Sequence, residues 1–181
     1  IFEEGDYPRY LYFVESGKVK LFKTNEDGKE YIINIYKEGE FFGYIDLIKD
    51  TEYSESAAAL QDTELRLVPK DDFLKLMYGN RDVASQLIKM LANNITDQEQ
   101  QLLNLAYNSV RRRVADAIIF LSEKEEKEDI SILRDDLARI VGTAKESVIR
   151  MLTEFKMDGY IDIIDGVIHI KDKEKLQNLH A

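Results

Sequence analysis

The pattern of hydrophobic and polar positions divides the chain into three stretches, and the middle one is the most regular. Residues 80–107 contain no proline or glycine, and their apolar residues recur every three or four positions. This spacing predicts one long helix with a narrow apolar stripe. The stripe is typical of a coiled-coil seam with a second copy of the chain, although a helix packed along its own domain is the alternative. The predicted dimer seam consists of Ala84, Leu87, Leu91, Ile95, Gln98, Leu102 and Leu105.

Residues 1–79 have the pattern of short strands separated by glycines. In residues 18–23 polar and apolar side chains alternate, as in a strand with one buried face. Asp27 and Gly28 precede a return strand at 31–36, and this dipeptide is favoured in tight hairpins because both residues tolerate positive φ angles. Many short strands of this kind indicate a barrel, sandwich or jelly roll. A further strand is expected at 64–68 and a short helix at 70–77.

Two short helices, expected at 134–141 and 144–158, are the most informative feature of the last stretch. Ala138 is small, so the second helix can cross closely over the first. Gly142 takes the turn, where a β-carbon would be strained, and Val148 is expected to lie between the helices. These positions match a helix-turn-helix, whose spacing also includes Leu137 and Met151.

An apolar hairpin with its turn at Asp165 and Gly166 follows this pair, which indicates the winged form of the motif. An ordinary helical hairpin has similar spacing, but the wing and the preceding seam favour DNA binding. We therefore expect an α+β protein in three parts. They are an N-terminal jelly-roll or double-stranded β-helix sensor domain (1–79), a long dimerisation helix (80–107) and a C-terminal winged helix-turn-helix domain (108–181).

In such a motif the second helix lies in the major groove, and its N-terminal side chains reach the base edges. Arg150 can bind guanine O6 and N7, and Glu146 can accept from a cytosine amino group; Lys145 is the third candidate reader. Thr143 and Ser147 are expected to contact phosphate near the helix N-terminus. Glu146 has a second interpretation, because Thr143 and Glu146 also match a capping box.

The charge distribution refines this picture. A net charge of −10 argues against bulk attraction to nucleic acid. Residues 1–79 hold 10 basic and 17 acidic side chains, or −7, whereas residues 107–181 hold 13 and 15, or −2. The near-neutral last stretch also contains the consecutive residues Arg111, Arg112 and Arg113.

Several classes of protein are not expected. The chain has no cysteine, which excludes cysteine-ligated iron–sulfur clusters and thiolate zinc sites. No membrane-length apolar run or signal-type segment is present, so we expect a cytoplasmic protein without a membrane partner. No Ser/His/Asp set, metal-ligand cluster or Walker-type loop suggests an enzyme. Because the chain begins at Ile1 within a strand pattern, we expect a further segment before it.

Three segments resemble the CRP/FNR family of bacterial regulators. Residues 137–150 (LARIVGTAKESVIR) resemble its DNA-reading motif, residues 11–19 (LYFVESGKV) resemble the opening of its cyclic-nucleotide-type jelly roll, and residues 41–43 (FFG) resemble the start of its phosphate-binding cassette. The resemblance covers essentially the whole chain except the family's N-terminal segment. It implies a homodimeric transcription regulator that senses a small effector and binds an inverted repeat in double-stranded DNA. RNA polymerase is a further candidate partner.

The effector site departs from the cAMP-binding members that the chain resembles. Their cassette has a Glu for the ribose and an Arg for the phosphate, where this chain has Tyr44 and Tyr53. Gln98 and Glu99 replace the Thr-Ser pair that meets adenine. Asp46 could replace the Glu, but no residue replaces the Arg, so we do not expect cAMP. The resemblance places the pocket at Phe42, Gly43, Tyr44, Ile45, Asp46, Tyr53, Ser54, Gln98 and Glu99.

Other effectors are left open. Haem sensing usually needs histidine, and the two histidines, His169 and His180, lie in the wing and the tail; a Tyr or Met ligand would still allow haem. A pocket with Tyr44 and Tyr53 would suit an aromatic or apolar effector. The alternative function is a cyclic-nucleotide-type regulatory or docking module of a larger signalling assembly, which would not need the reader helix.

Overall fold

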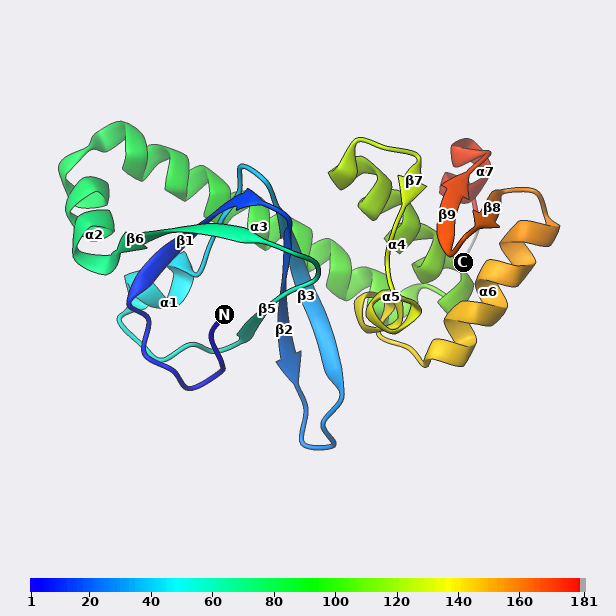
Figure 1. Ribbon diagram of the computed structural model, residues 1–181, viewed down its shortest axis with the longest axis horizontal. Helices are drawn as coiled ribbons and strands as arrows, with labels where there is room; N and C mark the ends of the chain where they lie inside the picture. The colour runs from blue at the N-terminus through cyan, green and yellow to red at the C-terminus, as the bar shows by residue number, and fades with distance from the viewer. Residues whose placement is uncertain (180–181) are drawn as a thin grey trace. The chain divides into compact units, whose positions relative to one another are not determined.

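The protein, described by a computed structural model for residues 1–179 apart from the side chain of Glu125, folds as two compact units. They are Ile1–Asp97 and Gln98–Ala181. Helix α3 (Arg81–Tyr107) is continuous and contributes residues to both (Figure 1). The predicted long helix is therefore confirmed, whereas the predicted three-part division remains a prediction.

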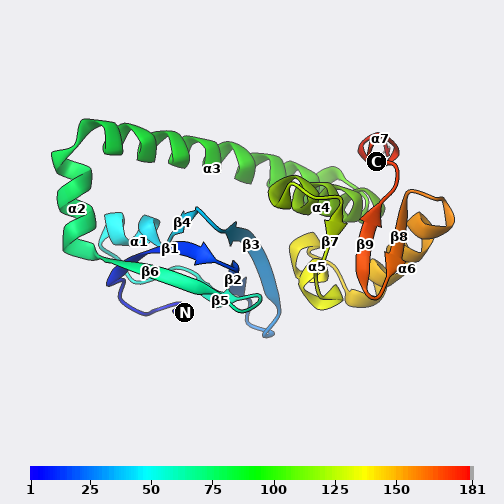
Figure 2. The ribbon, with the colours of Figure 1, turned by 45° about the horizontal axis from the view of Figure 1, so that its top comes forward.

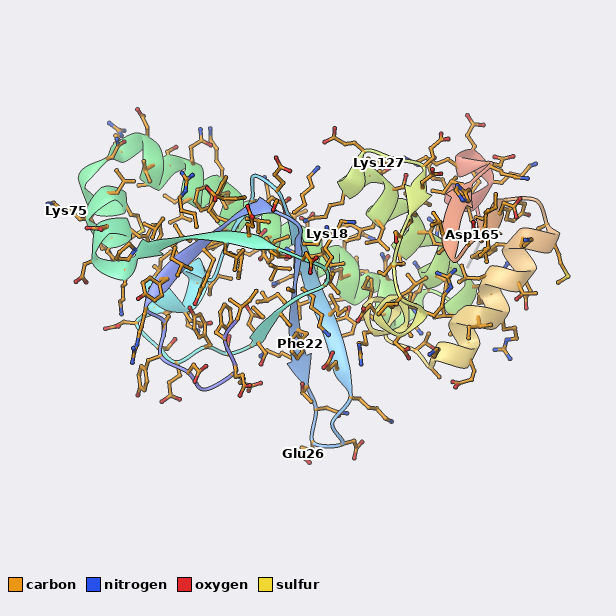
Figure 3. All side chains as sticks on the ribbon, viewed as in Figure 1. Lys18, Phe22, Glu26, Lys75, Lys127 and Asp165 are labelled. Atoms are coloured by element: carbon orange, nitrogen blue, oxygen red, sulfur yellow. The ribbon has the colours of Figure 1, made fainter. Side chains whose placement is uncertain are left out.

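The first unit contains two three-stranded antiparallel sheets, which Figures 1 and 2 show as the wall of a roll. The predicted hairpin is present: Gly28 has a φ of 77°, and its N–H donates to the carbonyl of Asn25 over 2.9 Å. Glu26 lies at its tip (Figure 3). One sheet has the order β4 (Phe41–Phe42), β1 (Tyr10–Ser16), β6 (Glu64–Pro69), and the other has the order β3 (Glu30–Lys37), β2 (Lys18–Thr24), β5 (Ser56–Ala59).

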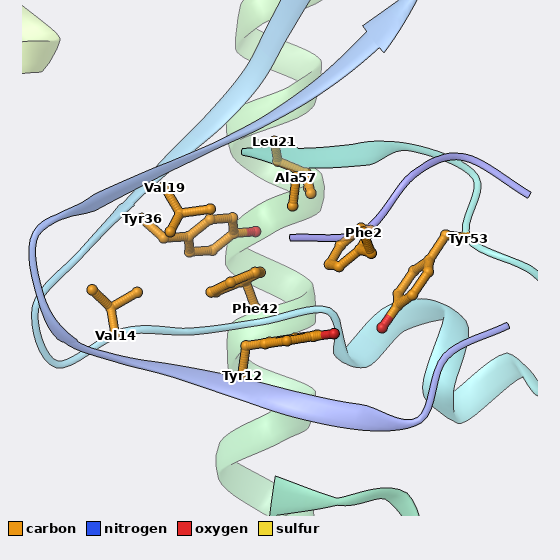
Figure 4. Close-up of a cluster of buried hydrophobic side chains, with 9 residues drawn as sticks. All are labelled: Phe2, Tyr12, Val14, Val19, Leu21, Tyr36, Phe42, Tyr53 and Ala57. Atoms are coloured by element: carbon orange, nitrogen blue, oxygen red, sulfur yellow. The ribbon is translucent and has the colours of Figure 1, made fainter. Parts of the chain in front are cut away.

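Aromatic side chains fill the space between these two sheets (Figure 4). The rings of Phe2 and Tyr53 are stacked with centroids 3.7 Å apart, and the ring of Tyr12 is stacked on Phe42 at 5.0 Å. Tyr36 completes the group by stacking on Phe42 at 5.4 Å. We call this set the roll interior: Phe2, Tyr12, Val14, Val19, Leu21, Tyr36, Phe42, Tyr53 and Ala57.

A second apolar cluster, built around Leu11, Tyr44 and Leu47, lies on the other face of the β4–β1–β6 sheet. Leu11 and Tyr12 are consecutive in β1 and belong to different clusters, because successive side chains in a strand point to opposite faces. Three helices contribute to the second cluster: α1 (Tyr44–Lys49), α2 (Lys70–Gly79) and the first turns of α3. The sequence pattern had not indicated α1.

The second unit has the predicted winged architecture. Strands β7, β8 and β9 form an antiparallel sheet in the order β7–β9–β8. The wing turn has positive φ at Asp165 (50°) and Gly166 (82°), as expected for an Asp-Gly hairpin. The C-terminal helix α7 was not predicted. The elements are α4 (Val110–Glu125), β7 (Asp129–Ile130), α5 (Arg134–Val141), α6 (Lys145–Met157), β8 (Ile161–Ile164), β9 (Val167–Ile170) and α7 (Lys173–Gln177).

The core of the second unit is made where its helices and wing meet. Ile118 of α4, Leu137 of α5 and Phe155 of α6 are fully buried. Ile161 and Ile168 of the wing are buried at the same level. Among the described helices, none combines the length and the apolar character that crossing a bilayer requires.

Candidate functional site

The two helices of the predicted motif meet through a tight turn. Gly142 ends α5 with a φ of 68°, the left-handed conformation that favours glycine. The N–H groups of Gly142 and Thr143 both turn back to the carbonyl of Ala138, the latter over 3.1 Å. Leu137 and Val148 are completely buried. The motif positions chosen from the sequence therefore make the helix–helix contact.

Helix α6 has one buried and one exposed side. Its buried residues are Val148, Met151, Leu152 and Phe155. The exposed residues recur at the complementary helical positions, which places them on one side of the helix. We call this side the outer face of α6: Lys145, Glu146, Ile149, Arg150 and Thr153.

The predicted readers differ in how they are held. Within the described chain, no hydrogen bond or ion pair engages the side chains of Glu146 and Arg150. In contrast, Lys145 Nζ lies 2.6 Å from the Asp135 carboxylate of α5. Thr143 and Ser147 are half-buried at the start of α6. Sequence reasoning had not indicated the pair of Lys145 and Asp135, because it joins residues of two helices.

The capping box suggested for Glu146 does not form. Ala144 is the N-cap residue of α6, and no side chain caps the helix. The Thr143 position therefore lies one residue too early for this role. The side chain of Glu146 is exposed and does not take part in capping the helix.

The three consecutive arginines serve the fold of the second unit. Arg111 binds Glu154 of α6 and Asp158 at the C-cap of that helix, each over 2.6 Å. Arg113 donates to the carbonyl of Val141 at the end of α5 over 3.0 Å, where a cation also complements the helix dipole. Arg112 pairs with Asp116 and donates to the carbonyls of Gln177 and Leu179. The side chains of this basic run are thus paired with other residues of the second unit and stabilise its fold.

The wing is tied to α5 by one arginine. Arg134 donates to the carbonyl of Gly166 in the wing turn over 2.9 Å and to that of Ile132 over 3.2 Å. Its burial lowers the pKa of the guanidinium from its ordinary value. Figure 3 shows Asp165 at this turn. His169 Nδ1 lies 2.6 Å from Asp129 Oδ1 and so joins two strands of the sheet; His180 lies outside the described residues.

The predicted effector residues of the cassette are used by the first unit itself. Phe42 is fully buried and Tyr53 is only 4% exposed, and both belong to the roll interior. The Tyr53 hydroxyl faces that of Tyr12 (Figure 4), and it has no partner of hydrogen-bonding geometry in the described chain. Burial raises the pKa of Tyr53 and of Tyr36 well above the ordinary value for tyrosine. Neither phenol is therefore a source of charge in this region.

Tyr44 and Asp46 also have structural partners. Tyr44 is buried in the second cluster, and its hydroxyl accepts a hydrogen bond from Asn94 Nδ2 of α3 over 2.6 Å. The Asp46 carboxylate is 2% exposed and accepts from the backbone N–H and the hydroxyl of Ser54 at 3.2 and 3.3 Å. Lys49 lies 3.2 Å from the same carboxylate. Asp46 is therefore engaged within its own loop, and its suggested role in place of the ribose-binding Glu stays a prediction.

The remaining predicted pocket residues lie in different surroundings. Gly43 has a φ of 79°, and a β-carbon there would lie 3.0 Å from the Tyr12 ring. Ile45 packs against the second cluster. Gln98 and Glu99 are exposed on α3 in the second unit, so their place beside a pocket stays a prediction. The predicted set of pocket residues did not include Phe2 or Glu55; burial and the charge of Asp46 raise the pKa of Glu55.

The seam residues on α3 divide into two sets. Leu87 and Leu91 pack against the second cluster of their own unit, so they belong to the chain's own core. Ile95 and Leu102 are 59% and 66% exposed, and Leu105 is 39% exposed. Ile88, which the predicted seam omitted, is 65% exposed. Ile88, Ile95 and Leu102 are spaced by seven residues, the repeat of a coiled-coil position.

Comparison with known proteins agrees with both units. The cyclic nucleotide-binding domain model matches residues 1–80, and the Crp-like helix-turn-helix domain model matches residues 112–179. The "Cyclic AMP receptor protein" of Thermus thermophilus is 32% identical over 179 residues, covering 99% of this chain and 83% of that protein. The "Transcriptional activator protein anr" of Pseudomonas aeruginosa is 26% identical over 183 residues, covering 97% and 75%.

A solved structure shares the fold. FixK2 from Bradyrhizobium japonicum superposes with a TM-score of 0.91 at 25% sequence identity, covering 100% of this chain and 92% of that one. The Pseudomonas relative is named as an activator of transcription. The order of the two domain models, the identity to a relative over nearly the full chain and the shared fold lead to one assignment: the chain belongs to the CRP/FNR family of transcription regulators.

Proposed function

We propose that this regulator is a homodimer that reads an inverted repeat through the outer face of α6. The observation that carries the proposal is that Glu146 and Arg150 extend from this face without side-chain partners in the described chain. An arginine can donate to O6 and N7 of guanine, and a glutamate can accept from cytosine N4. As a bacterial DNA-binding regulator it would act in the cytoplasm, with RNA polymerase as a candidate partner.

The second copy would pack on the exposed stripe of α3. Ile88, Ile95 and Leu102 are large apolar side chains that are 59–66% exposed in the single chain. Burying each would contribute about 1.5–3 kcal/mol per chain, enough to offset a substantial part of the cost of association. Ala84, Gln98 and Leu105 remain proposed as flanking contacts. Leu87 and Leu91 would support the helix from the roll side.

We further propose that the roll does not use cAMP. Burial, and after it the charges of Glu55 and Glu40, raise the pKa of Tyr36 and of Tyr44. A cyclic phosphate brought there would meet negative charge without an arginine to pair with it. Phe2, Tyr12, Phe42 and Tyr53 also occupy the space between the sheets with their own rings. The name of the Thermus relative refers to cAMP, and isothermal calorimetry with cAMP would decide the matter for this chain.

The test of the central proposal is a binding-site selection with the purified protein, followed by fluorescence-anisotropy titration on the selected duplex. We expect an inverted repeat whose half-site centres are about 34 Å apart, or roughly one helical turn. Half-sites with a TGA element would match the resemblance to the family. Binding of all sequences with equal affinity would contradict a reading role for α6.

A further inference from the structure

Ile149 is an exception on α6. The other large apolar side chains in the first three turns of this helix are buried, whereas Ile149 is 45% exposed on the outer face. It follows Glu146 by three positions and precedes Arg150 by one, so it lies among the proposed readers. An isoleucine in this place gains nothing from water and has no charge or hydrogen bond to offer a base.

Thr153 extends the same apolar strip by one helical turn. Its hydroxyl donates to the carbonyl of Ile149 over 2.9 Å. This hydrogen bond occupies the hydroxyl within the helix, as is common for threonine in helices. The methyl group is then the part of Thr153 that a partner can contact. Two neighbouring positions of the outer face therefore offer aliphatic carbon.

Few groups in the major groove can make a favourable contact with the aliphatic side chains of Ile149 and Thr153. Base edges there present hydrogen-bond donors and acceptors, with one exception, the C5-methyl group of thymine. We infer that Ile149 is a specificity-determining residue that selects thymine through this methyl group. The thymine belongs to the same half-site as the guanine bound by Arg150. The inference rests on the proposed function, because it requires α6 to lie in the major groove.

Such a contact would add a base preference that the hydrogen bonds of Glu146 and Arg150 do not provide. Glu146 and Arg150 can select cytosine and guanine, whereas Ile149 would select thymine by contact with one methyl group. Burial of one methyl-sized group changes affinity by about fourfold. A palindromic site contains two such thymines, one for each chain of the dimer. Replacing both should weaken binding by about fifteenfold if the two contacts are independent.

The test uses the selected duplex with each thymine replaced in turn by uracil, which lacks only the methyl group. For the wild-type protein, we expect one thymine per half-site whose replacement weakens binding about fourfold. Ile149→Ala should bind thymine and uracil duplexes equally at this position. Met157→Ala is the matched control: Met157 is 74% exposed at the end of α6, away from the proposed readers, and this variant should keep the uracil penalty.

The outcomes separate this inference from the proposal on which it rests. A protein that selects a site and depends on Arg150, but shows no uracil penalty anywhere, overturns the role of Ile149 alone. A uracil penalty that persists in Ile149→Ala has the same consequence. A protein that selects no sequence at all overturns both proposals. Thermal unfolding of Ile149→Ala is expected to match the wild type, because an exposed side chain contributes little to the core.

Discussion

The side chains of the roll interior and those on the outer face of α6 differ in whether they have partners within the chain. In the roll, Phe2 stacks on Tyr53, Tyr12 stacks on Phe42, and the nearby Asp46 carboxylate is bonded to Ser54. On α6, Glu146 and Arg150 extend to solvent with no side-chain partner in the described residues. Groups whose interactions are completed inside the chain stabilise the fold, and groups left open are available to a second molecule.

The same contrast separates the cations of the second unit. Arg111 and Arg113 connect helices of the second unit, so replacing either should destabilise the fold of this unit. Arg150 connects nothing in the described chain and would be costly to remove only for binding. Local density of positive charge therefore does not coincide with the proposed DNA-binding surface, because the clustered arginines form ion pairs and hydrogen bonds with neighbouring helices.

The largest effect is expected for truncation in the roll interior. Phe42→Ala removes a fully buried ring that contacts Phe2, Tyr12 and Tyr36. It should lower the free energy of unfolding of the first unit by about 3–5 kcal/mol, measured by urea denaturation. Phe41→Ala, at a neighbouring ring that is 38% exposed, is the control and should cost much less. Equal losses in both variants would show that the interior is not a packed core.

The next effect concerns the two sides of α3. Ile95→Asp should weaken the proposed dimer by about a hundredfold or more, because it removes apolar burial from both chains and places two like charges together. Analytical ultracentrifugation over a concentration series measures this. Leu91→Ala should instead destabilise the first unit, since Leu91 packs on its core. A wild-type protein that is monomeric at micromolar concentration would contradict the seam.

Arg150→Ala should reduce affinity for the selected duplex by about 1–3 kcal/mol per half-site and relax the preference at one guanine. The physical reason is the loss of both hydrogen bonds to that base. Anisotropy titration of wild type and variant on the same duplex checks the affinity, and repeated site selection checks the preference. Unchanged affinity and preference would show that Arg150 is not a reader.

A smaller effect should follow from Glu55. Its pKa is raised mainly by burial and then by the charge of Asp46, against the opposing charges of Lys23 and Lys49. A raised carboxyl pKa favours the folded state at low pH and costs stability as pH rises through the folded-state pKa. Glu55→Gln should therefore raise the melting temperature at pH 7, and the gain should disappear as pH falls to about 4. A gain that does not vary with pH would exclude this cause.

The smallest effect is expected for Asp135→Asn, which releases Lys145 from its ion pair. The pair is about half exposed, so the change should tighten binding to DNA by no more than about fivefold at low salt. The dependence of affinity on salt should also become slightly steeper as Lys145 gains access to phosphate. Lys145→Ala in the same background should remove the gain, and a gain that survives would have another origin.

The features that the sequence alone determined are those set by local periodicity and turn chemistry. The recurrence of apolar residues every three or four positions predicted α3, the helix-turn-helix spacing predicted α6, and the Asp-Gly pairs predicted both hairpins. Leu137, Ala138, Gly142, Val148 and Met151, together with the wing hairpin, located the helix-turn-helix. Because a helix repeats every 3.6 residues, the exposed side of α6 follows once its buried side is known.

Only the tertiary structure decided which groups find partners within the chain. Leu87 and Leu91 pack against the second cluster, whereas Ile88 on the same helix is exposed and belongs to the proposed seam. Asp46 binds Ser54, and Lys145 binds Asp135. Arg113 reaches the end of α5, 28 residues along the chain. Such contacts join different elements or loops of the chain, 8, 10 and 28 residues apart in these three cases. Their energies depend on geometry that no local pattern encodes.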